Sequence, residues 1–413
     1  MLISLTNGCQ KKKNINAIYI NLYKILNGVK KIGIITILKV NNYGAELQSV
    51  ALPYVLNKHG YKAEIIDYLF YKNSRHQFSK EDVPMNGGRW EKWIKNIIKY
   101  RIINCILDNV IPFFSKNQRL RNERFRNFNN KCSAYSEEYR SMSALYKYHQ
   151  HYDVYITGSD CVWCYYTDAS IEPYFLTFAP QNARKLSYAS SFGVSEIPGN
   201  LWEKYKKLIE NIDVISVRET HGVNIIRNLC NRKAELVLDP TLLLDKEAWK
   251  EFQLNQLNLP RKKYVLVYQL YPSEKLISIA KKIANDNNLP IWCICKRALF
   301  NPVYKDVKNI ADAGPSEFLS YIMNAKCVVT DSFHGTAFSV NFNVDFYTVL
   351  SKTKKDNSRM ESFLELLNLQ KRLIWQENDG DIKYESIDFN EANVILNKER
   401  NKSISFILNA IEK

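Results

Sequence analysis

The order of apolar and polar residues predicts an α/β protein. Residues 31 to 40 form a β-branched run of strand length, residues 45 to 60 carry apolar positions at helical spacing, and residues 63 to 68 form a second apolar run. This strand, helix, strand order is typical of a βαβ unit, in which the two strands lie parallel in one sheet. Further strands are expected at 153 to 160, 184 to 193, 214 to 219 and 235 to 240.

The same alternation returns after a predicted linker at 239 to 262, with strands expected at 264 to 270, 289 to 296, 327 to 332 and 344 to 350. A chain of 413 residues is long enough for two domains. We therefore predict two Rossmann-like, doubly wound domains that face each other across a cleft. The predicted segments are an N-terminal extension (1 to 30), a first domain (31 to 245) with a helical insertion at about 70 to 148, and a second domain (262 to 413) that ends in helices.

The charge of the chain points to an anionic partner. With 46% hydrophobic and 24% charged residues the composition is that of a globular protein, and the formal net charge is +16. The basic residues are scattered along the chain and match no nucleic-acid-binding motif, so no nucleic acid is expected. Phosphorylated small molecules or an anionic membrane surface remain as partners, beside a plain solvated lysine surface.

The cysteines and the hydropathy pattern favour the cytoplasm. Nine widely spaced cysteines indicate free thiols in a reducing compartment more than a disulfide framework. The first 30 residues lack the order of a signal peptide, and no apolar run approaches about 18 residues. We therefore expect a cytoplasmic protein without a spanning segment.

Candidate chemistry lies in the loops that follow strands, because ligands of open α/β sheets bind at the carboxyl ends of the strands. Four such loops carry polar or small residues, at 41 to 44, 158 to 160, 190 to 193 and 331 to 335. In the last one, His334 stands at the start of a predicted helix, whose free N–H groups favour an anion. It would act there as a proton donor or a second cation, and the alternative is a capping or packing histidine.

Other candidates also allow two interpretations. Arg218 and Arg359 could each clamp a carboxylate or phosphate, or pair with a neighbouring acid such as Glu219. Tyr43 and Trp163 could stack on a sugar or belong to the core.

The cysteine pairs Cys161/Cys164 and Cys293/Cys295 do not have the spacing of an ordinary zinc site, and we expect neither a metal site nor thiol redox chemistry. The sequence contains no Walker A loop, G-x-G-x-x-G, H-E-x-x-H or G-x-S-x-G motif.

Taken together, the motifs resemble the polysaccharide pyruvyl transferase family. They read KIGIITILKVNNYGAELQSVAL, YITGSDCVWC, EPYFLTFAP, KLSYASSFG, ISVRETHGV, LVLDPTLLLDKEAW and VVTDSFHGTAFS, and the likeness covers about residues 31 to 370. The resemblance implies a GT-B-like fold and the transfer of pyruvate from phosphoenolpyruvate onto sugar hydroxyls as a ketal. Such a reaction serves bacterial exopolysaccharide, capsule or cell-wall biosynthesis.

The resemblance also assigns roles to residues. His334 matches a histidine proposed as the catalytic acid, and Arg218 matches an arginine attributed to phosphoenolpyruvate binding. The cleft-facing positions of the motifs fall on Asn42, Gly44, Asp160 and Arg359, and the predicted binding set is completed by Tyr43, Gly158, Ser159, Ser332 and Gly335.

Two departures from the family pattern stand out. Ser332 occupies a position where arginine is common, and Cys161 and Cys164 replace the polar residues of G-S-D-Q-V-W-N.

Ketal formation needs an acid, a base and cations, which His334, Asp331 and Arg218 would supply without a metal or an organic cofactor. A histidine acid would give an alkaline limb of the rate near the usual histidine pKa. The basic surface would suit a lipid-linked glycan acceptor and a peripheral contact with the inner membrane face. Two rival functions stay open: a GT-B-type glycosyltransferase that uses a nucleotide sugar, and a non-catalytic glycan-binding member of the family.

Overall fold

The structure is a computed structural model that describes residues 28–79, 82–85, 94–95, 98, 102–147, 152–254, 262–296, 302–353, 357–378 and 383–413. Of the predicted N-terminal extension, residues 1–27 lie outside the described residues.

The first half is organised around a parallel sheet in the order β3-β2-β1-β4-β5. Its strands are β1 (Lys31–Ile35), β2 (Lys62–Tyr68), β3 (Tyr135–Tyr139), β4 (Val154–Thr157) and β5 (Arg184–Ser187). The short parallel pair β6 (Ser216–Val217) and β7 (Glu235–Leu236) continues this sheet through isolated bridges from Leu186 to Val214 and from Ser190 to Val217.

The helices of the first half are α2 (Tyr43–Lys58), α4 (Ile111–Phe114), α5 (Lys116–Cys132), α6 (Met142–Lys147), α7 (Trp202–Glu210) and α8 (Thr220–Cys230). A π-helical turn, η1 (Ile106–Val110), precedes α4, and 3₁₀ turns lie at Glu172–Phe175 (η2) and Gly199–Leu201 (η3). The predicted helical insertion thus contains helices, but it also contributes β3 to the edge of the sheet.

The second half has a sheet in the order β10-β9-β8-β11-β12-β13, and its strand pairs are parallel. The strands are β8 (Val265–Gln269), β9 (Ile291–Cys295), β10 (Val307–Ile310), β11 (Cys327–Thr330), β12 (Asp345–Leu350) and β13 (Leu373–Trp375). The helices are α10 (Glu274–Asp286), α11 (Pro315–Asn324), α12 (Phe333–Asn341), α13 (Ser358–Leu366) and α14 (Asn390–Glu412), with a 3₁₀ turn at Gln370–Arg372 (η6).

Both sheets follow the Rossmann strand order, because the chain starts in the middle, moves outward to one edge, and then crosses back to build the other side. Each sheet therefore has a switch point, between β1 and β4 in the first half and between β8 and β11 in the second. The predicted class, α/β with two Rossmann-like, doubly wound domains facing a cleft, is confirmed; the exact domain boundaries stay a prediction.

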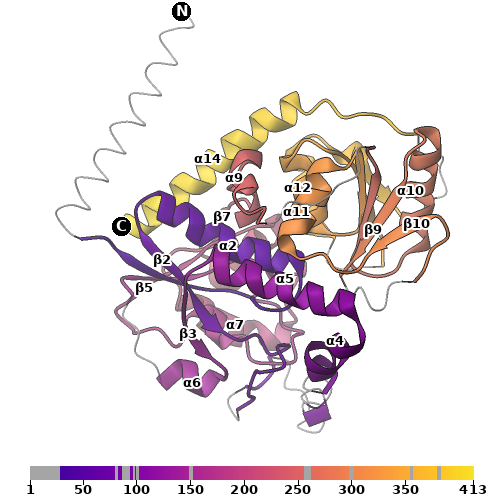
Figure 1. Cartoon of the computed structure of the whole chain (residues 1–413). Coiled ribbons are helices and arrows are strands. Elements are labelled where there is room, and N and C mark those ends of the chain that lie inside the picture. Colours follow the sequence, from indigo (N-terminus) through magenta and orange to yellow (C-terminus); the bar gives the residue numbers. More distant parts are fainter. Residues whose placement is uncertain are drawn as a thin grey trace, which may run out of the picture.

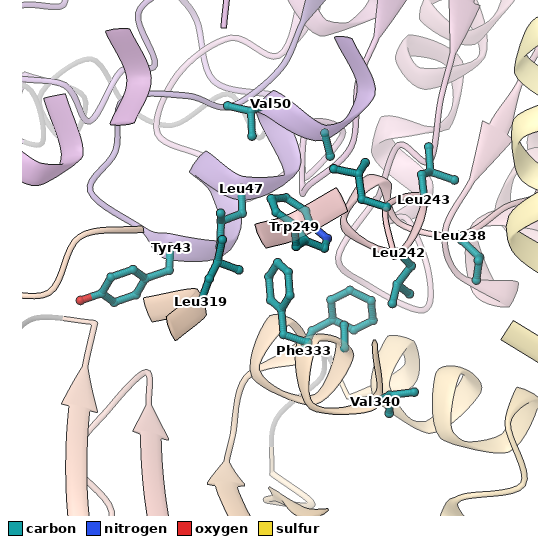
Figure 2. Packing of buried hydrophobic residues seen from close by; sticks show 14 of the residues in the cluster. Tyr43, Leu47, Val50, Leu238, Leu242, Leu243, Trp249, Leu319, Phe333 and Val340 are labelled. Atoms are coloured by element: carbon teal, nitrogen blue, oxygen red, sulfur yellow. The ribbon is translucent and has the colours of Figure 1, made fainter. Parts of the chain in front are cut away.

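One buried core joins the two halves. Leu47 on α2, Trp249 on α9 (Lys246–Lys250) and Phe333 on α12 belong to the same cluster of buried residues (Figure 2). The Trp249 ring lies 5.2 Å from the ring of Phe338, and its Nε1 donates to the Thr241 carbonyl at 2.9 Å, within the turn η4 (Pro240–Leu242). Thr241 and Trp249, which lie in the predicted linker between the two sheets, are therefore part of the packed and hydrogen-bonded core.

The last helix, α14, runs from the second half back along the first half (Figure 1). Ser403 Oγ accepts from Leu238 N at 3.0 Å, Glu412 forms a 3.0 Å ion pair with Lys30, and Tyr61 donates to Glu412 at 2.6 Å. Arg400 on the same helix donates to Leu242 O at 2.7 Å and to Asn341 Oδ1 at 2.9 Å. This helix therefore ties both halves together.

Candidate functional site

A cleft of about 830 Å³ opens where the carboxyl ends of the two sheets meet. The first half contributes Asn41 and Asn42 after β1 and Asp160 after β4; the second half contributes Leu270 after β8 and the residues from Asp331 to His334 after β11. The cleft thus lies at both switch points, where ligands bind in this class of sheet.

The cleft receives only part of the predicted site. Its lining includes the predicted residues Asn42, Asp160, Asp331, Ser332, His334 and Arg359, together with Cys161 and Cys164. The predicted loop at 190 to 193 does not line the cleft, since Ser190, Ser191 and Phe192 are completely buried below it.

His334 is held between the two halves. Ser332 caps α12, its Oγ accepting from Gly335 N at 3.4 Å, and this places His334 in the first turn of the helix. The imidazole lies directly against Gly44 of the first half: a Cβ at Gly44 would be 1.9 Å from His334 Nδ1. Only a glycine fits opposite this ring, which explains its place at the start of α2.

The opposite edge of the ring faces Asp239. His334 Nε2 lies 3.9 Å from Asp239 Oδ1 and makes no hydrogen bond among the described residues. Burial lowers the pKa of His334 to about 4, although Asp239 opposes this effect. His334 is therefore neutral at pH 7 in this structure. The expected alkaline limb of the rate near the usual histidine pKa stays a prediction.

Arg218 lies beside the cleft floor and not in its lining. Its guanidinium donates to Asp239 Oδ2 at 2.7 Å, Asp160 Oδ1 at 3.2 Å and Ser159 Oγ at 3.3 Å, and it lies 3.8 Å from Glu219. The side chain is completely buried. Of the two interpretations of Arg218, pairing with acidic residues fits its contacts. The nearest carboxylates are those of Asp239 and Asp160.

This ion-pair cluster keeps its acids charged. Burial alone would raise the pKa of Asp239, but Arg218 and His334 outweigh it and lower the pKa to about 2. Burial likewise opposes ionisation of Asp160, whose pKa is lowered by Arg218, His334 and Arg359. Arg218 thus favours the charged form of both carboxylates that raise the pKa of His334.

Asp331 and Ser332 form the second-half wall. Asp331 Oδ1 accepts from Leu270 N at 2.7 Å, which connects the ends of β8 and β11. Ser332 N donates to Thr330 Oγ1 at 3.1 Å. Ser332 therefore serves as a helix cap where an arginine is common in the family pattern, and it brings no positive charge.

Several predicted binding residues are structural. Tyr43 is completely buried, stacks on Phe318 at 4.6 Å and donates to Ala313 O at 2.9 Å, so the sugar-stacking interpretation is not supported by its position. Trp163 is also a core residue, stacked on Phe175 at 5.0 Å. Ser159 is buried and donates to Asp239 at 3.0 Å.

The two remaining glycines lie close to other parts of the fold and are not in the cleft lining. A Cβ at Gly158 would lie 3.0 Å from Thr36 Cβ, and one at Gly335 would lie 2.5 Å from Thr330 Oγ1. These positions need a small residue for packing beneath the site.

Three residues that the sequence prediction omitted take part in the site. Asp239 and Lys296 end predicted strands, so the same loop rule could have selected them. Arg121 on α5 lines the cleft and donates to the carbonyls of Asn41, Lys296 and Ala313, and to the hydroxyl of Tyr43. No sequence signal separates Arg121 from the other arginines of α5.

Cys161 and Cys164 line the cleft as free thiols. Arg359 Nη1 lies 3.4 Å from Cys161 Sγ. Burial raises the pKa of Cys161 despite Arg359, and it raises the pKa of Cys164 to about 12. Both side chains are therefore protonated at neutral pH.

Within the described ranges, no group of three or more His, Cys, Asp or Glu side chains is arranged to hold a metal ion. The described part of the chain also includes no helix that is both long and apolar enough to cross a bilayer.

The fold and the site define a two-domain, GT-B-like α/β protein with a charged cleft between its sheets. The family model of polysaccharide pyruvyl transferases matches residues 42–352, so the chain belongs to this family of transferases. The likeness of the motifs to this family is thereby confirmed. A comparison with curated proteins finds no match.

Solved structures of similar overall topology show low sequence identity. The UDP-N-acetylglucosamine 2-epimerase of Rickettsia bellii is 12% identical, with 92% of this chain and 98% of that chain covered and a TM-score of 0.45. The E. coli ADP-heptose LPS heptosyltransferase II is 12% identical (91% and 99% covered, TM-score 0.37). The glycosyltransferase SnogD of Streptomyces nogalater is 10% identical (91% and 95% covered, TM-score 0.41).

Proposed function

We propose that this protein transfers pyruvate from phosphoenolpyruvate to sugar hydroxyls of a cell-surface polysaccharide precursor, forming a ketal. The observation that carries the proposal is the position of His334, which stands at the N-terminus of α12 in the cleft of a polysaccharide pyruvyl transferase family member. The N–H groups at a helix N-terminus favour the phosphate or carboxylate of such a donor.

The cations of the cleft support an anionic donor. Arg359 and Lys296 line it, and the buried Arg121 adds positive potential although its terminal N–H groups already bond the protein. These three residues would supply the positive charge that Ser332 does not. Arg218, engaged by Asp239 and Asp160, would position the acids near His334 and not clamp the donor directly.

His334 would deliver the proton. Burial lowers its pKa, but a phosphate and a carboxylate bound beside it would raise the pKa, since negative charge favours the imidazolium. The proton would pass to the methylene carbon of phosphoenolpyruvate, leaving an oxocarbenium-like centre at the neighbouring carbon.

The remaining steps need a base and two hydroxyls. The first sugar hydroxyl adds to the oxocarbenium carbon and gives its proton to Asp331, which lines the cleft. The C–O bond to phosphate then breaks, and the second hydroxyl bonds to the same carbon, its proton leaving with phosphate. The scheme balances without a metal or an organic cofactor. The reaction would take place in the cytoplasm, on a soluble or lipid-linked glycan.

A phosphate-release assay with phosphoenolpyruvate and a panel of soluble and lipid-linked glycans tests the proposal. Release that depends on both the glycan and His334, with pyruvate recovered on the glycan by mass spectrometry, supports it. The absence of release with every acceptor, together with donor or glycan binding by calorimetry, would favour the non-catalytic member of the family.

The volume of the cleft also fits a second candidate function, a glycosyltransferase that uses a nucleotide sugar. About 830 Å³ has room for a nucleotide sugar as well as for phosphoenolpyruvate and an acceptor. Calorimetric titration with phosphoenolpyruvate and with UDP-sugars separates the two. Binding of UDP-sugars in preference to phosphoenolpyruvate would favour a GT-B-type glycosyltransferase.

A further inference from the structure

The segment from 102 to 114 exposes apolar side chains along one face. Helical turns run from 102 to 105 and continue through η1 into α4. Ile102, Ile106 and Val110 recur at intervals of four residues and are exposed, and Phe113 and Phe114 follow with 85% and 88% of their surface exposed. Two neighbouring phenylalanines exposed to this extent indicate a surface that binds a partner, because contiguous exposed apolar patches are typical of interaction sites.

The other face of the same segment borders the cleft. Ile103, Asn104, Leu107 and Asp108 line it. Asp108 accepts from Ser74 Oγ at 2.8 Å, which fixes the rotation of the helix relative to the first half. One helix therefore carries both a cleft wall and an outward apolar face.

Positive charge follows the apolar face directly. After Phe114 the chain enters α5, whose first turn contains no acidic residue and whose exposed residues include Lys116 and Arg119. The whole chain carries a formal charge of +16. Apolar side chains beside cations are the combination that binds at the surface of an anionic bilayer, since the rings enter the acyl boundary while the cations stay among the headgroups.

We propose that the face formed by Ile102, Ile106, Val110, Phe113 and Phe114, with Lys116 and Arg119 beside it, contacts an anionic lipid bilayer. The membrane-facing helix would then hold the cleft at the bilayer surface. The role of this contact in catalysis rests on the proposed function, because a lipid-linked glycan would reach the cleft along the 102 to 114 segment. The lipid contact itself is independent of that chemistry.

Sedimentation with vesicles tests the lipid contact on the full chain. We expect binding to vesicles that contain phosphatidylglycerol, and weaker binding to pure phosphatidylcholine or at high salt. The double variant Phe113→Ser/Phe114→Ser should bind at least about ten-fold more weakly. Lys116→Gln/Arg119→Gln should lose about five-fold per charge at low salt. Val394→Ser, at an exposed valine of α14, is the matched control and should bind as wild type.

Three results would overturn the proposal. The first is that wild type does not sediment with anionic vesicles. The second is that the phenylalanine double variant binds as well as wild type. The third is that Val394→Ser loses as much binding as the double variant. If the double variant instead converts a lipid-free dimer into a monomer and keeps its vesicle binding, the face serves a second copy of the chain.

The two proposals fail separately. With soluble glycans, the phenylalanine variant should release phosphate like wild type, because these two rings are not in the cleft lining. Vesicle binding without phosphate release from any acceptor would count against the pyruvyl transfer and leave the lipid contact standing. Phosphate release without vesicle binding would count against the lipid contact and leave the pyruvyl transfer standing.

Discussion

The two sides of the cleft hold their polar groups by different means. On the first-half side, the buried Arg218 binds the buried Asp239 and the cleft-lining Asp160, so the charges compensate one another. On the second-half side, Asp331 and Ser332 are held by backbone N–H groups, and His334 Nε2 has no hydrogen bond among the described residues. The first side is a fixed ionic floor, whereas the second carries a group whose protonation can change.

His334→Gln should have the largest effect on activity, because it removes the group on the second-half side whose protonation can change. Glutamine keeps a polar side chain of similar size but cannot deliver a proton near pH 7. We expect phosphate release to fall by about 10² to 10⁴ while donor binding and the melting temperature at pH 7 stay close to wild type. A variant that turns over normally would move the acid to another residue, and one that unfolds would identify a packing histidine.

The wild-type pH profile gives an independent readout of the same residue. Because an anionic donor should raise the pKa of His334, the alkaline limb of kcat should lie at higher pH than that of kcat/KM, which reports the free enzyme. Identical limbs would mean that the donor does not act on His334.

Arg218→Ala tests the ionic floor. The sequence alone predicts a donor-binding arginine, and its loss would then mainly raise KM. In the structure the substitution leaves the fully buried Asp239 and the partly buried Asp160 without their partner, so we expect a loss of about 3 to 5 kcal/mol of unfolding free energy. Denaturant titration measures it, with the exposed Arg227→Ala as control, expected within about 0.5 kcal/mol. Unchanged stability with a raised KM would restore the donor-binding role.

The fold was accessible from the sequence because its signals are local. The β-branched run at 31 to 40, the helix pattern that follows it and the next apolar run are local patterns, and together they predict a parallel βαβ unit. The strand β3 was missed because YSEEY is polar, and its position depends on pairing with β2 across a long separation in sequence. Edge strands with such composition resemble loops.

The site was accessible only to the level of loops. The rule that ligands bind at strand ends selected the loops of Asn42, Asp160 and His334, which do meet in one cleft. The rule could not tell which side chain of a loop faces outward: Ser159 turns into the core beside the outward Asp160. Arg121 comes from α5, and its place in the cleft depends on tertiary packing alone.

Gly44→Ala would test the contact between the two sides. The added methyl group would overlap His334 Nδ1, so the ring or α12 must move. We expect turnover to fall by about 10²-fold, as is common when a catalytic group is displaced by about 1 Å. The matched change is Ala45→Gly, one residue along α2, which removes a methyl group and does not crowd the ring. Equal activity of Gly44→Ala and wild type would show that the ring is not held where the structure has it.

Acid should weaken the second-half side first. The pKa of His334 is lowered from its usual 6.5 to about 4, so below pH 6.5 the unfolded chain takes up a proton that the folded protein does not. Stability therefore falls as the pH falls from about 6.5 to 4, with a loss of about 2 kcal/mol between pH 7 and pH 5. The stabilisation from Asp239 is present above its ordinary pKa of 3.8 and is lost as the pH falls from there to about 2. In His334→Gln this part of the pH dependence should vanish, as denaturant titrations at pH 5 and pH 7 would show; an equal loss in both proteins would assign it elsewhere.

Replacing the two cysteines of the first-half wall should have the smallest effect. Cys161 and Cys164 stand where the family pattern has polar residues, and burial raises the pKa of both thiols, so neither is a thiolate nucleophile at neutral pH. Cys161→Ser/Cys164→Ser roughly keeps the shape of both side chains and keeps an acceptor for Arg359 Nη1 at position 161. We expect activity within about three-fold of wild type, and no dependence of either protein on reductant. Activity that requires a thiol reductant in wild type and not in the double variant would show instead that these cysteines oxidise in the cleft and control access to Arg359.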